Sequence, residues 1–189
     1  PPGTDWAYSH TEMAALVQVL EQASGQSLEE LMANRIYEPL GMTASSAHQN
    51  NAIEPPLMHG FTNQRGVYED STFWDPTWGL AGGMNASVDD LGTWLRALNR
   101  GQLLSPADAK ESLGPATAGL GKLTTQRYFA WGSLVSGGWI LGNPSLNGYM
   151  GFTAQHRDPS VTIVVWSTAA KGSKEDVNAS QVIAQRIAP

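Results

Sequence analysis

The feature that most constrains the fold of this chain is a change in residue pattern near Gly121. Before it, apolar residues recur at helical spacing in segments that begin with capping residues and end in glycine. After it, short runs of β-branched and aromatic residues alternate with Gly, Pro and Asn, which is typical of an antiparallel meander. A mainly helical and loop region at 1–120, followed by strands and one helix at 121–189, predicts an α+β fold in a single domain covering 1–189.

Four helices are predicted before Gly121 and one at the end of the chain. The first should begin near Ser9, whose spacing to Glu12 matches a capping box, and should stop at Gly25. Its apolar face is a stripe at i, i+3, i+4 and i+7, made of Met13, Leu16, Val17 and Leu20. The other helices are expected after Ser27 up to Pro39 and Gly41, from Ser87 to Gly101, within 105–114, and from about Asn178 to Ile187.

Two further segments have distinctive compositions. Residues 43–82 are rich in Asn, Pro, Gly and aromatic residues such as Trp78, without sustained periodicity, so they predict a long and mostly irregular excursion. The number of aromatic residues argues against disorder and for a functional loop. The run from Val161 to Trp166 is apolar on both faces, which predicts a central strand that is covered on both sides.

Charge and composition exclude several functional classes. The net charge is −6 and the 11 Lys and Arg residues are scattered singly, so we expect no nucleic-acid partner. The absence of cysteine excludes disulfides, thiolate nucleophiles and Cys-ligated metals, and the four histidines show no metal-ligand spacing. No run approaches the roughly 18 apolar residues of a membrane helix, so no membrane span is expected.

Two quoted segments carry a resemblance to a known family. Residues 1–42 are PPGTDWAYSHTEMAALVQVLEQASGQSLEELMANRIYEPLGM, and residues 78–98 are WGLAGGMNASVDDLGTWLRAL. They resemble the serine β-lactamase-like superfamily, in the branch of class C β-lactamases, DD-carboxypeptidases and related family VIII-type esterases, where Tyr-Ser-Asn at a helix start precedes Pro-Leu-Gly-Met. The resemblance covers nearly the whole chain. It implies a β-lactamase/transpeptidase-like fold whose N-terminal part is missing from this sequence.

The resemblance assigns roles to Tyr8 and His10. In the family, the tyrosine of the Tyr-x-Asn motif lies beside the nucleophilic serine and acts as a general base or proton relay, which implies that Tyr8 is catalytic. The third motif position binds substrate, and here it is His10 instead of asparagine. Because an imidazole cannot present a carbonyl and an amide together, substrate recognition should differ at this position. The structural alternative for Tyr8 is packing at a helix N-terminus.

A second family motif, Lys-Thr-Gly or His-x-Gly on a strand lining the site, has two possible registers in NPSLNGYMGFTAQHRDP. One register is Leu146-Asn147-Gly148 and the other is Tyr149-Met150-Gly151. We expect Asn147, Gly148 and Tyr149 to bind substrate, although the basic residue is missing in both registers. Its absence argues against DD-peptidase and β-lactam chemistry, because nothing in the motif would hold a substrate carboxylate. A plain strand and turn is the structural alternative.

The family's nucleophile motif, Ser-x-x-Lys, does not occur in this sequence. The nearest imitation, Thr168-Ala-Ala-Lys171, follows a predicted strand and heads no helix. We therefore predict the C-terminal part of a serine hydrolase that acts on an ester, amide or β-lactam through an acyl-enzyme whose nucleophile lies outside this chain. The substrate is expected to be a small molecule or peptide-like, with no metal or organic cofactor, and this chain alone should be inactive.

Two other functions stay open at this point. One is a non-catalytic binding module of the same fold that recognises a cell-wall or lipid-like ligand, and the other is an inert structural fragment. If early strands and helices of the fold are missing, a strand edge and apolar helix faces lack cover, which predicts association with a chain that supplies them, or self-association. The resemblance favours a bacterial protein that is exported or held in the cell envelope, although the sequence leaves the compartment open.

Overall fold

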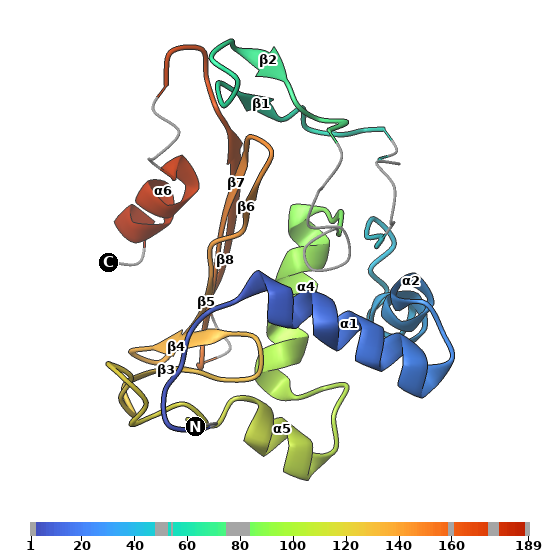
Figure 1. Ribbon diagram of the computed structural model, residues 1–189, viewed down its shortest axis with the longest axis vertical. Coiled ribbons are helices and arrows are strands. Elements are labelled where there is room, and N and C mark those ends of the chain that lie inside the picture. Colours follow the sequence, from blue (N-terminus) through green and yellow to red (C-terminus); the bar gives the residue numbers. More distant parts are fainter. Residues whose placement is uncertain are drawn as a thin grey trace.

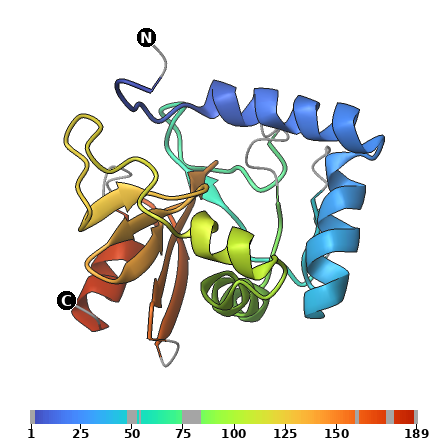
Figure 2. The same ribbon diagram turned by 90° about the horizontal axis from the view of Figure 1, so that it is seen from below.

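Among the described elements, a six-stranded antiparallel sheet separates one helix from the others. The computed structural model describes residues 3–47, 53, 55–74, 84–158, 161–173 and 178–187. In both ribbon views, α6 (Ala179–Ile187) lies on one side of the sheet and α1 (His10–Ser24), α4 (Val88–Arg100) and α5 (Pro106–Ser112) lie on the other (Figures 1 and 2). The predicted α+β fold is confirmed.

The helices begin at the capping residues that the sequence predicts. The Ser9 side chain accepts a hydrogen bond from the Glu12 amide at the start of α1, and Ser87 caps α4 in the same way through Asp90. α1 ends at Gly25, where φ is 69°, a left-handed conformation that glycine adopts at little cost. None of the described helices has both the length and the apolarity to cross a lipid bilayer.

The second helical segment passes through Pro39 and ends at Gly41, the later of the two residues at which its end is predicted. It consists of α2 (Leu28–Met32), a π-helical turn η1 (Ala33–Tyr37) and α3 (Glu38–Leu40), and it ends at Gly41. A proline lacks an N–H and crowds the carbonyl four residues earlier in an α-helix. The wider turn, in which the Glu38 amide bonds to the Ala33 carbonyl, precedes Pro39 and lets the helix pass it.

The strand order is β3-β4-β5-β7-β6. Strands β5 and β6 pair with different parts of one edge of β7, and β8 pairs with its opposite edge. Its longest pairing is between β7 and β8, with Gly151 opposite Trp166. The strands have these bounds: β3 (Arg127–Phe129), β4 (Leu134–Ser136), β5 (Trp139–Gly142), β6 (Ser145–Leu146), β7 (Tyr149–His156) and β8 (Thr162–Thr168).

The position of β8 corrects one prediction. The expected cover on both faces is present, since α4 and α6 contact β8 from opposite sides of the sheet (Figure 1). The strand is not central, however, because within the described residues it pairs with β7 alone. A strand that is apolar on both faces is covered by helices above and below it. The same pattern does not depend on how many strands pair with it.

The described part of the excursion (43–82) packs against the end of the sheet where β7 begins and β8 ends. It contains a small ribbon of β1 (Phe61–Thr62) and β2 (Glu69–Asp70), which lies at the end of β7 and β8 in Figure 1. The Phe61 amide donates to Thr168 Oγ1 at 2.7 Å, and the Tyr68 hydroxyl donates to the Ala169 carbonyl at 3.2 Å. Trp78, one of the aromatic residues noted in the sequence, lies outside the described residues.

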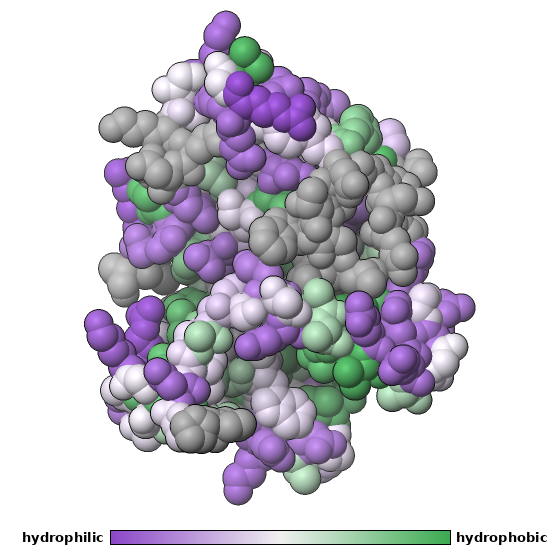
Figure 3. All heavy atoms as spheres, in the orientation of Figure 1, coloured by the Kyte–Doolittle hydropathy of each residue, from purple (hydrophilic) through white to green (hydrophobic). Residues whose placement is uncertain are grey.

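The apolar face of α1 is only partly covered. Of its predicted stripe, Val17 is buried, whereas Leu16 is 51% and Leu20 is 42% exposed. Figure 3 shows apolar surface gathered beside this helix. The stripe therefore exists as predicted, but two of its four residues, Leu16 and Leu20, stay exposed.

Candidate functional site

Tyr8 and His10 lie together at the start of α1. Their rings meet edge to face at 5.1 Å, and the Tyr8 side chain is 59% exposed. Behind them, Phe129 in β3 has its ring centroid 6.3 Å from that of Tyr8. Trp6 stacks on Phe129 with a centroid distance of 4.1 Å. An accessible phenol is thus supported by two aromatic rings.

Hydrogen bonds fix the strand that carries this support. Thr117 Oγ1 donates to the Phe129 carbonyl at 2.9 Å and accepts from the Phe129 amide at 2.8 Å. The buried Tyr128 hydroxyl donates to the Leu113 carbonyl at 2.9 Å. The sequence analysis did not identify Trp6 or Phe129. The signal that could have found Trp6 is its spacing of two from Tyr8 in an extended segment, where alternate residues share a face.

Asn147 and Gly148 form the two-residue turn between β6 and β7. Their φ angles are 48° and 82°, and Leu146 pairs with Tyr149 across the turn. Two consecutive positive φ angles in a hairpin favour Asn-Gly, and this short-range signal was present in the sequence but was not used. The first motif register therefore falls on the end of β6 and the turn, and the second register begins β7. Which register is functional stays a prediction.

The ribbon of the excursion docks onto this turn. The buried Ser71 hydroxyl donates to the Asn147 carbonyl at 2.6 Å, and the Tyr149 hydroxyl donates to the Met58 carbonyl at 2.8 Å. A Cβ atom on Gly148 would overlap the backbone of Phe61. The predicted substrate-binding residues Asn147, Gly148 and Tyr149 therefore hold the ribbon, whereas Tyr8, with His10 beside it, lies against Phe129 of β3. The structure places the two groups on different supports.

A titratable pair lies in the docked ribbon. His59 Nδ1 is 2.7 Å from Asp70 Oδ2, and the Thr72 amide donates to Asp70 Oδ1 at 2.9 Å. Hydrogen bonds from the side chain and backbone of Thr72, and then from His59, lower the pKa of Asp70 from 3.8 to about 2. The sequence does not reveal this pair, because the partner of His59 comes from the other strand of the ribbon.

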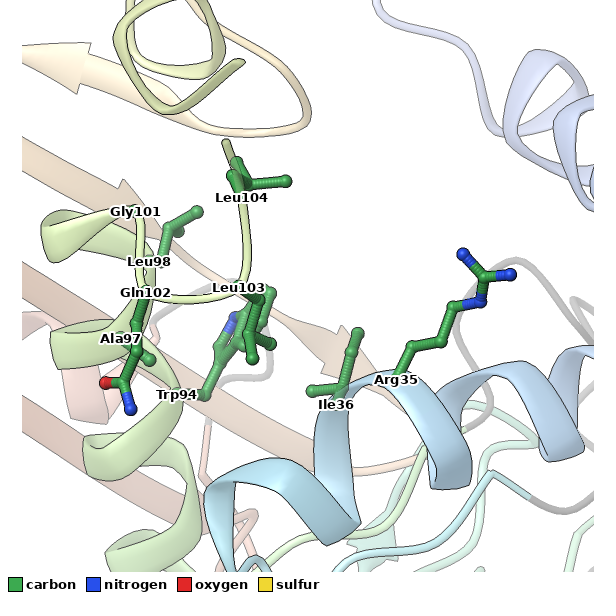
Figure 4. Close-up of a pocket in the computed structure, with 9 residues that line it drawn as sticks. All are labelled: Arg35, Ile36, Trp94, Ala97, Leu98, Gly101, Gln102, Leu103 and Leu104. Carbon is green, nitrogen blue, oxygen red and sulfur yellow. The ribbon is translucent and has the colours of Figure 1, made fainter. Parts of the chain in front are cut away.

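An apolar cavity lies away from these residues. This cavity, of about 260 Å³, lies between η1, α4 and the segment that follows α4, with the guanidinium of Arg35 pointing away from the apolar side chains (Figure 4). None of the predicted site residues lines it. Its lining consists of Arg35, Ile36, Trp94, Ala97, Leu98, Gly101, Gln102, Leu103 and Leu104.

Thr168 is the last residue of β8 and its Oγ1 accepts from the Phe61 amide, so Thr168-Ala-Ala-Lys171 heads no helix, as predicted. Across the described residues, no group of three or more His, Asp or Glu side chains could hold a metal ion.

Curated relatives match about half of the chain. Unguisins hydrolase ungD of Aspergillus violaceofuscus is 24% identical over 106 residues, which are 52% of this chain and 19% of that protein. D-aminopeptidase of Brucella ovis is 27% identical over 106 residues, with the same coverage. The matched region is thus a small part of each relative.

Solved structures share the fold over most of the chain. A penicillin binding protein from Bacillus halodurans has a TM-score of 0.80 at 18% identity, covering 99% of this chain and 57% of its own. A D-stereospecific amidohydrolase from Streptomyces sp. has a TM-score of 0.78 at 22% identity, covering 89% of this chain and 52% of its own. The chain therefore spans about half the length of these structures.

A family model described as Beta-lactamase matches residues 1–187, nearly the entire sequence. The match agrees with the order of helices and strands and with the structural neighbours. The chain belongs to the beta-lactamase family.

Proposed function

We propose that this chain is the C-terminal part of a serine hydrolase that cleaves an amide or ester through an acyl-enzyme, with the nucleophile supplied by a segment outside this chain. The observation that carries the proposal is the accessible phenol of Tyr8, which stands beside His10 at the start of α1 on an aromatic support. A proton-transfer group must be both reachable by substrate and held in place, and Tyr8 meets both conditions.

The proposed reaction has two steps. The serine hydroxyl attacks the substrate carbonyl and passes its proton to the Tyr8 oxygen, while Tyr8 gives its own hydroxyl proton to the leaving amine or alcohol and so stays a neutral phenol. Water hydrolyses the acyl-enzyme by the reverse sequence of proton transfers. His10 binds the substrate beside the reacting bond, with an imidazole in place of the family's asparagine amide. This scheme uses no metal ion or organic cofactor.

The names of the relatives favour an amide of a D-amino acid, in a small molecule or a peptide. Both the Brucella ovis D-aminopeptidase and the Streptomyces D-stereospecific amidohydrolase carry that specificity in their names. β-Lactam hydrolysis is less well supported, because neither motif register around 146–151 has a basic residue. Fold alone does not choose between these substrates, so the preference for an amide rests on those names.

The segment that carries the nucleophile would also complete the fold. β8 has helices on both faces and, among the described strands, pairs only with β7, so its other edge can accept a further strand. The exposed Leu16 and Leu20 on α1 offer apolar surface to the same addition. We infer that the completing polypeptide binds to the free edge of β8 and to the exposed apolar face of α1.

Tyr8→Phe tests the proposal in the form of the protein that includes a Ser-x-x-Lys segment. Hydrolysis of D-phenylalanine p-nitroanilide and of p-nitrophenyl acetate would be measured. We expect kcat/KM to fall by about 100-fold or more, since a positioned acid-base group contributes on that order. The matched control is Tyr68→Phe, which removes a hydroxyl from the ribbon instead. A folded, complete protein that cleaves neither compound would defeat the proposal, and an active Tyr8→Phe variant would defeat the assignment of Tyr8.

A second candidate is a binding module without catalysis. It is favoured by the use of the Asn147 carbonyl and the Tyr149 hydroxyl to hold the ribbon, and by the absence of a basic motif residue. In that case muramyl peptides or lipids should raise the melting temperature of the chain itself. If none of these compounds raises the melting temperature, this candidate function is excluded.

A further inference from the structure

The cavity between η1 and α4 rests on the hydrophobic core. Its volume of about 260 Å³ lies just below the range of ~300–1,000 Å³ that is typical of pockets for drug-sized ligands. Ile36 lines it from η1 and Trp94 from α4, and both pack against the core cluster around the buried Tyr37. A cavity of this size with one wall in the core suits a short, mainly apolar ligand.

The opposite wall is a turn that packing holds in shape. Gly101 ends α4 with a φ of 61°, and the Leu104 amide donates to its carbonyl at 3.1 Å. A Cβ atom on Gly101 would overlap the Cβ atom of Ala109 in α5, so the turn is packed closely against that helix. Leu103 and Leu104, which line the cavity from this turn, are 37% and 40% exposed. The wall is therefore preformed, and it offers apolar surface that an occupant would cover.

Arg35 gives the cavity a charged rim. It is exposed, and its guanidinium extends beyond the apolar lining side chains (Figure 4). Among the described residues, no hydrogen bond or ion pair involves this guanidinium. In a chain whose net charge is −6, an unpaired cation beside an apolar cavity offers a local site for an anion. A guanidinium can hold a carboxylate through two parallel hydrogen bonds.

The walls and the rim together select the kind of occupant. A peptide segment would bring backbone N–H and C=O groups that need partners, whereas most of the lining side chains are apolar. A hydrocarbon chain needs no such partners, and a carboxylate at its end would meet the guanidinium at the rim. A short amphiphile with an anionic head matches both parts of the cavity.

We propose that the cavity between η1 and α4 binds a short-chain aliphatic carboxylate, with the hydrocarbon chain against Trp94 and Leu103 and the carboxylate on Arg35. The site goes beyond the proposed function, because neither Tyr8 nor any other predicted site residue lines it. Binding there needs no nucleophile and can be measured on this chain.

The test compares three probes that share a hydrocarbon chain and differ in the head group: octanoate, octan-1-ol and octylammonium. Each is titrated, below its micelle concentration, into the 189-residue chain while the indole N–H signals are followed by NMR. The Trp94 signal is identified by its absence from Trp94→Phe. We expect octanoate to shift it in a saturable way, octan-1-ol to bind about tenfold more weakly, and octylammonium to bind more weakly still. Equal affinity for octanoate and octylammonium, or no saturable shift with octanoate, would overturn the proposal.

Variants separate the charge from the apolar wall. Arg35→Gln should weaken octanoate by about tenfold and leave octan-1-ol unchanged, because only the cation is lost. Arg100→Gln, which removes an exposed arginine from the last turn of α4 outside the cavity, is the matched control and should bind octanoate normally. Leu103→Ser should weaken both probes. Normal octanoate binding by Arg35→Gln would refute the role assigned to its charge.

A second control concerns the exposed apolar face of α1. Leu16→Gln/Leu20→Gln should bind octanoate as the wild type does, since neither leucine lines the cavity. Loss of binding in this double variant would place the ligand on α1 and overturn the proposal.

The same titration on the form of the protein that includes a Ser-x-x-Lys segment decides whether the completing polypeptide covers the cavity. Octanoate binding at Trp94 in both forms would support the proposal. Binding by the 189-residue chain alone would overturn it, because the cavity would then be a seat for the rest of the polypeptide. Hydrolysis enters neither outcome, so this proposal and the proposed function can fail separately.

Discussion

Gly148 and Gly66 have nearly the same backbone conformation but different surroundings. Their φ angles are 82° and 80°, in the left-handed region that side chains disfavour. A Cβ atom on Gly148 would overlap Phe61, whereas one on Gly66 would meet no atom within 4 Å. The first glycine is therefore required by contact as well as by conformation, and the second by conformation alone.

Alanine substitution at these two positions should separate the free-energy cost of the left-handed conformation from the cost of the contact with Phe61. Gly66→Ala should lower the free energy of unfolding by about 1 kcal/mol, the cost of a left-handed residue. Gly148→Ala should lower it by about 3 kcal/mol, because the overlap with the ribbon adds to that cost. Urea unfolding followed by circular dichroism measures both. Equal losses of unfolding free energy in the two variants would mean that the contact between Gly148 and Phe61 adds no cost.

Asp70 should make stability depend on pH in the acid range. Its pKa in the folded chain is about 2, below its ordinary value of 3.8, so the folded state binds this proton less tightly than the unfolded state. The stabilising contribution is complete above about pH 4 and is lost as the pH falls through about 2. The melting temperatures of the wild type and of Asp70→Asn should therefore converge between pH 4 and pH 2. A constant difference would contradict the assignment.

Asp90 connects the start of α4 to the segment that follows α3 through side-chain hydrogen bonds. Its Oδ2 accepts from the Ala44 amide at 2.9 Å and from the Ser45 hydroxyl at 2.8 Å, so the start of α4 holds the segment that follows α3. Asp89, its neighbour, is exposed and shares only the favourable position in the first turn of the helix.

Replacement of each aspartate by alanine tests this tie. Asp90→Ala should lower the free energy of unfolding by about 2 kcal/mol, because two donors lose a charged acceptor. Asp89→Ala should cost about 0.5 kcal/mol, the loss of an interaction with the helix dipole alone. Thermal unfolding of the two variants gives the comparison, and similar losses would mean that the two hydrogen bonds contribute little.

The elements that the sequence predicts correctly are those set by local signals. Ser9, Ser87 and the glycines past α1 and α4 fix helix ends through contacts a few residues away, and period-two runs fix the strands. The sequence could also have revealed the Asn147-Gly148 turn. It could not reveal the edge position of β8 or the His59–Asp70 pair, because both depend on which distant segments meet.

Apolar surface is distributed unevenly between the two sides of the sheet. Leu16 and Leu20 lie one turn apart on α1 and are both largely exposed, on the side of the sheet that also carries α4 and α5. They form one apolar surface, and the edge of β8 that no described strand covers is a second place where another chain can bind.

We expect the 189-residue chain to self-associate in the absence of a completing segment. Light scattering should give a mass above 20.2 kDa that rises with concentration, and the double variant Leu16→Gln/Leu20→Gln should lower it. Ile187→Gln, which removes an exposed apolar side chain on α6 across the sheet, is the control. A single-chain mass at high concentration, with cooperative melting, would refute this expectation.

The docking of the ribbon also has a kinetic consequence. The hydrogen bonds that attach it to the sheet join positions between 76 and 107 apart, among the most non-local contacts of the fold. Contacts of such high order form late, after the local turns of the meander have closed. During refolding the strands should regain their circular dichroism before the ribbon attaches.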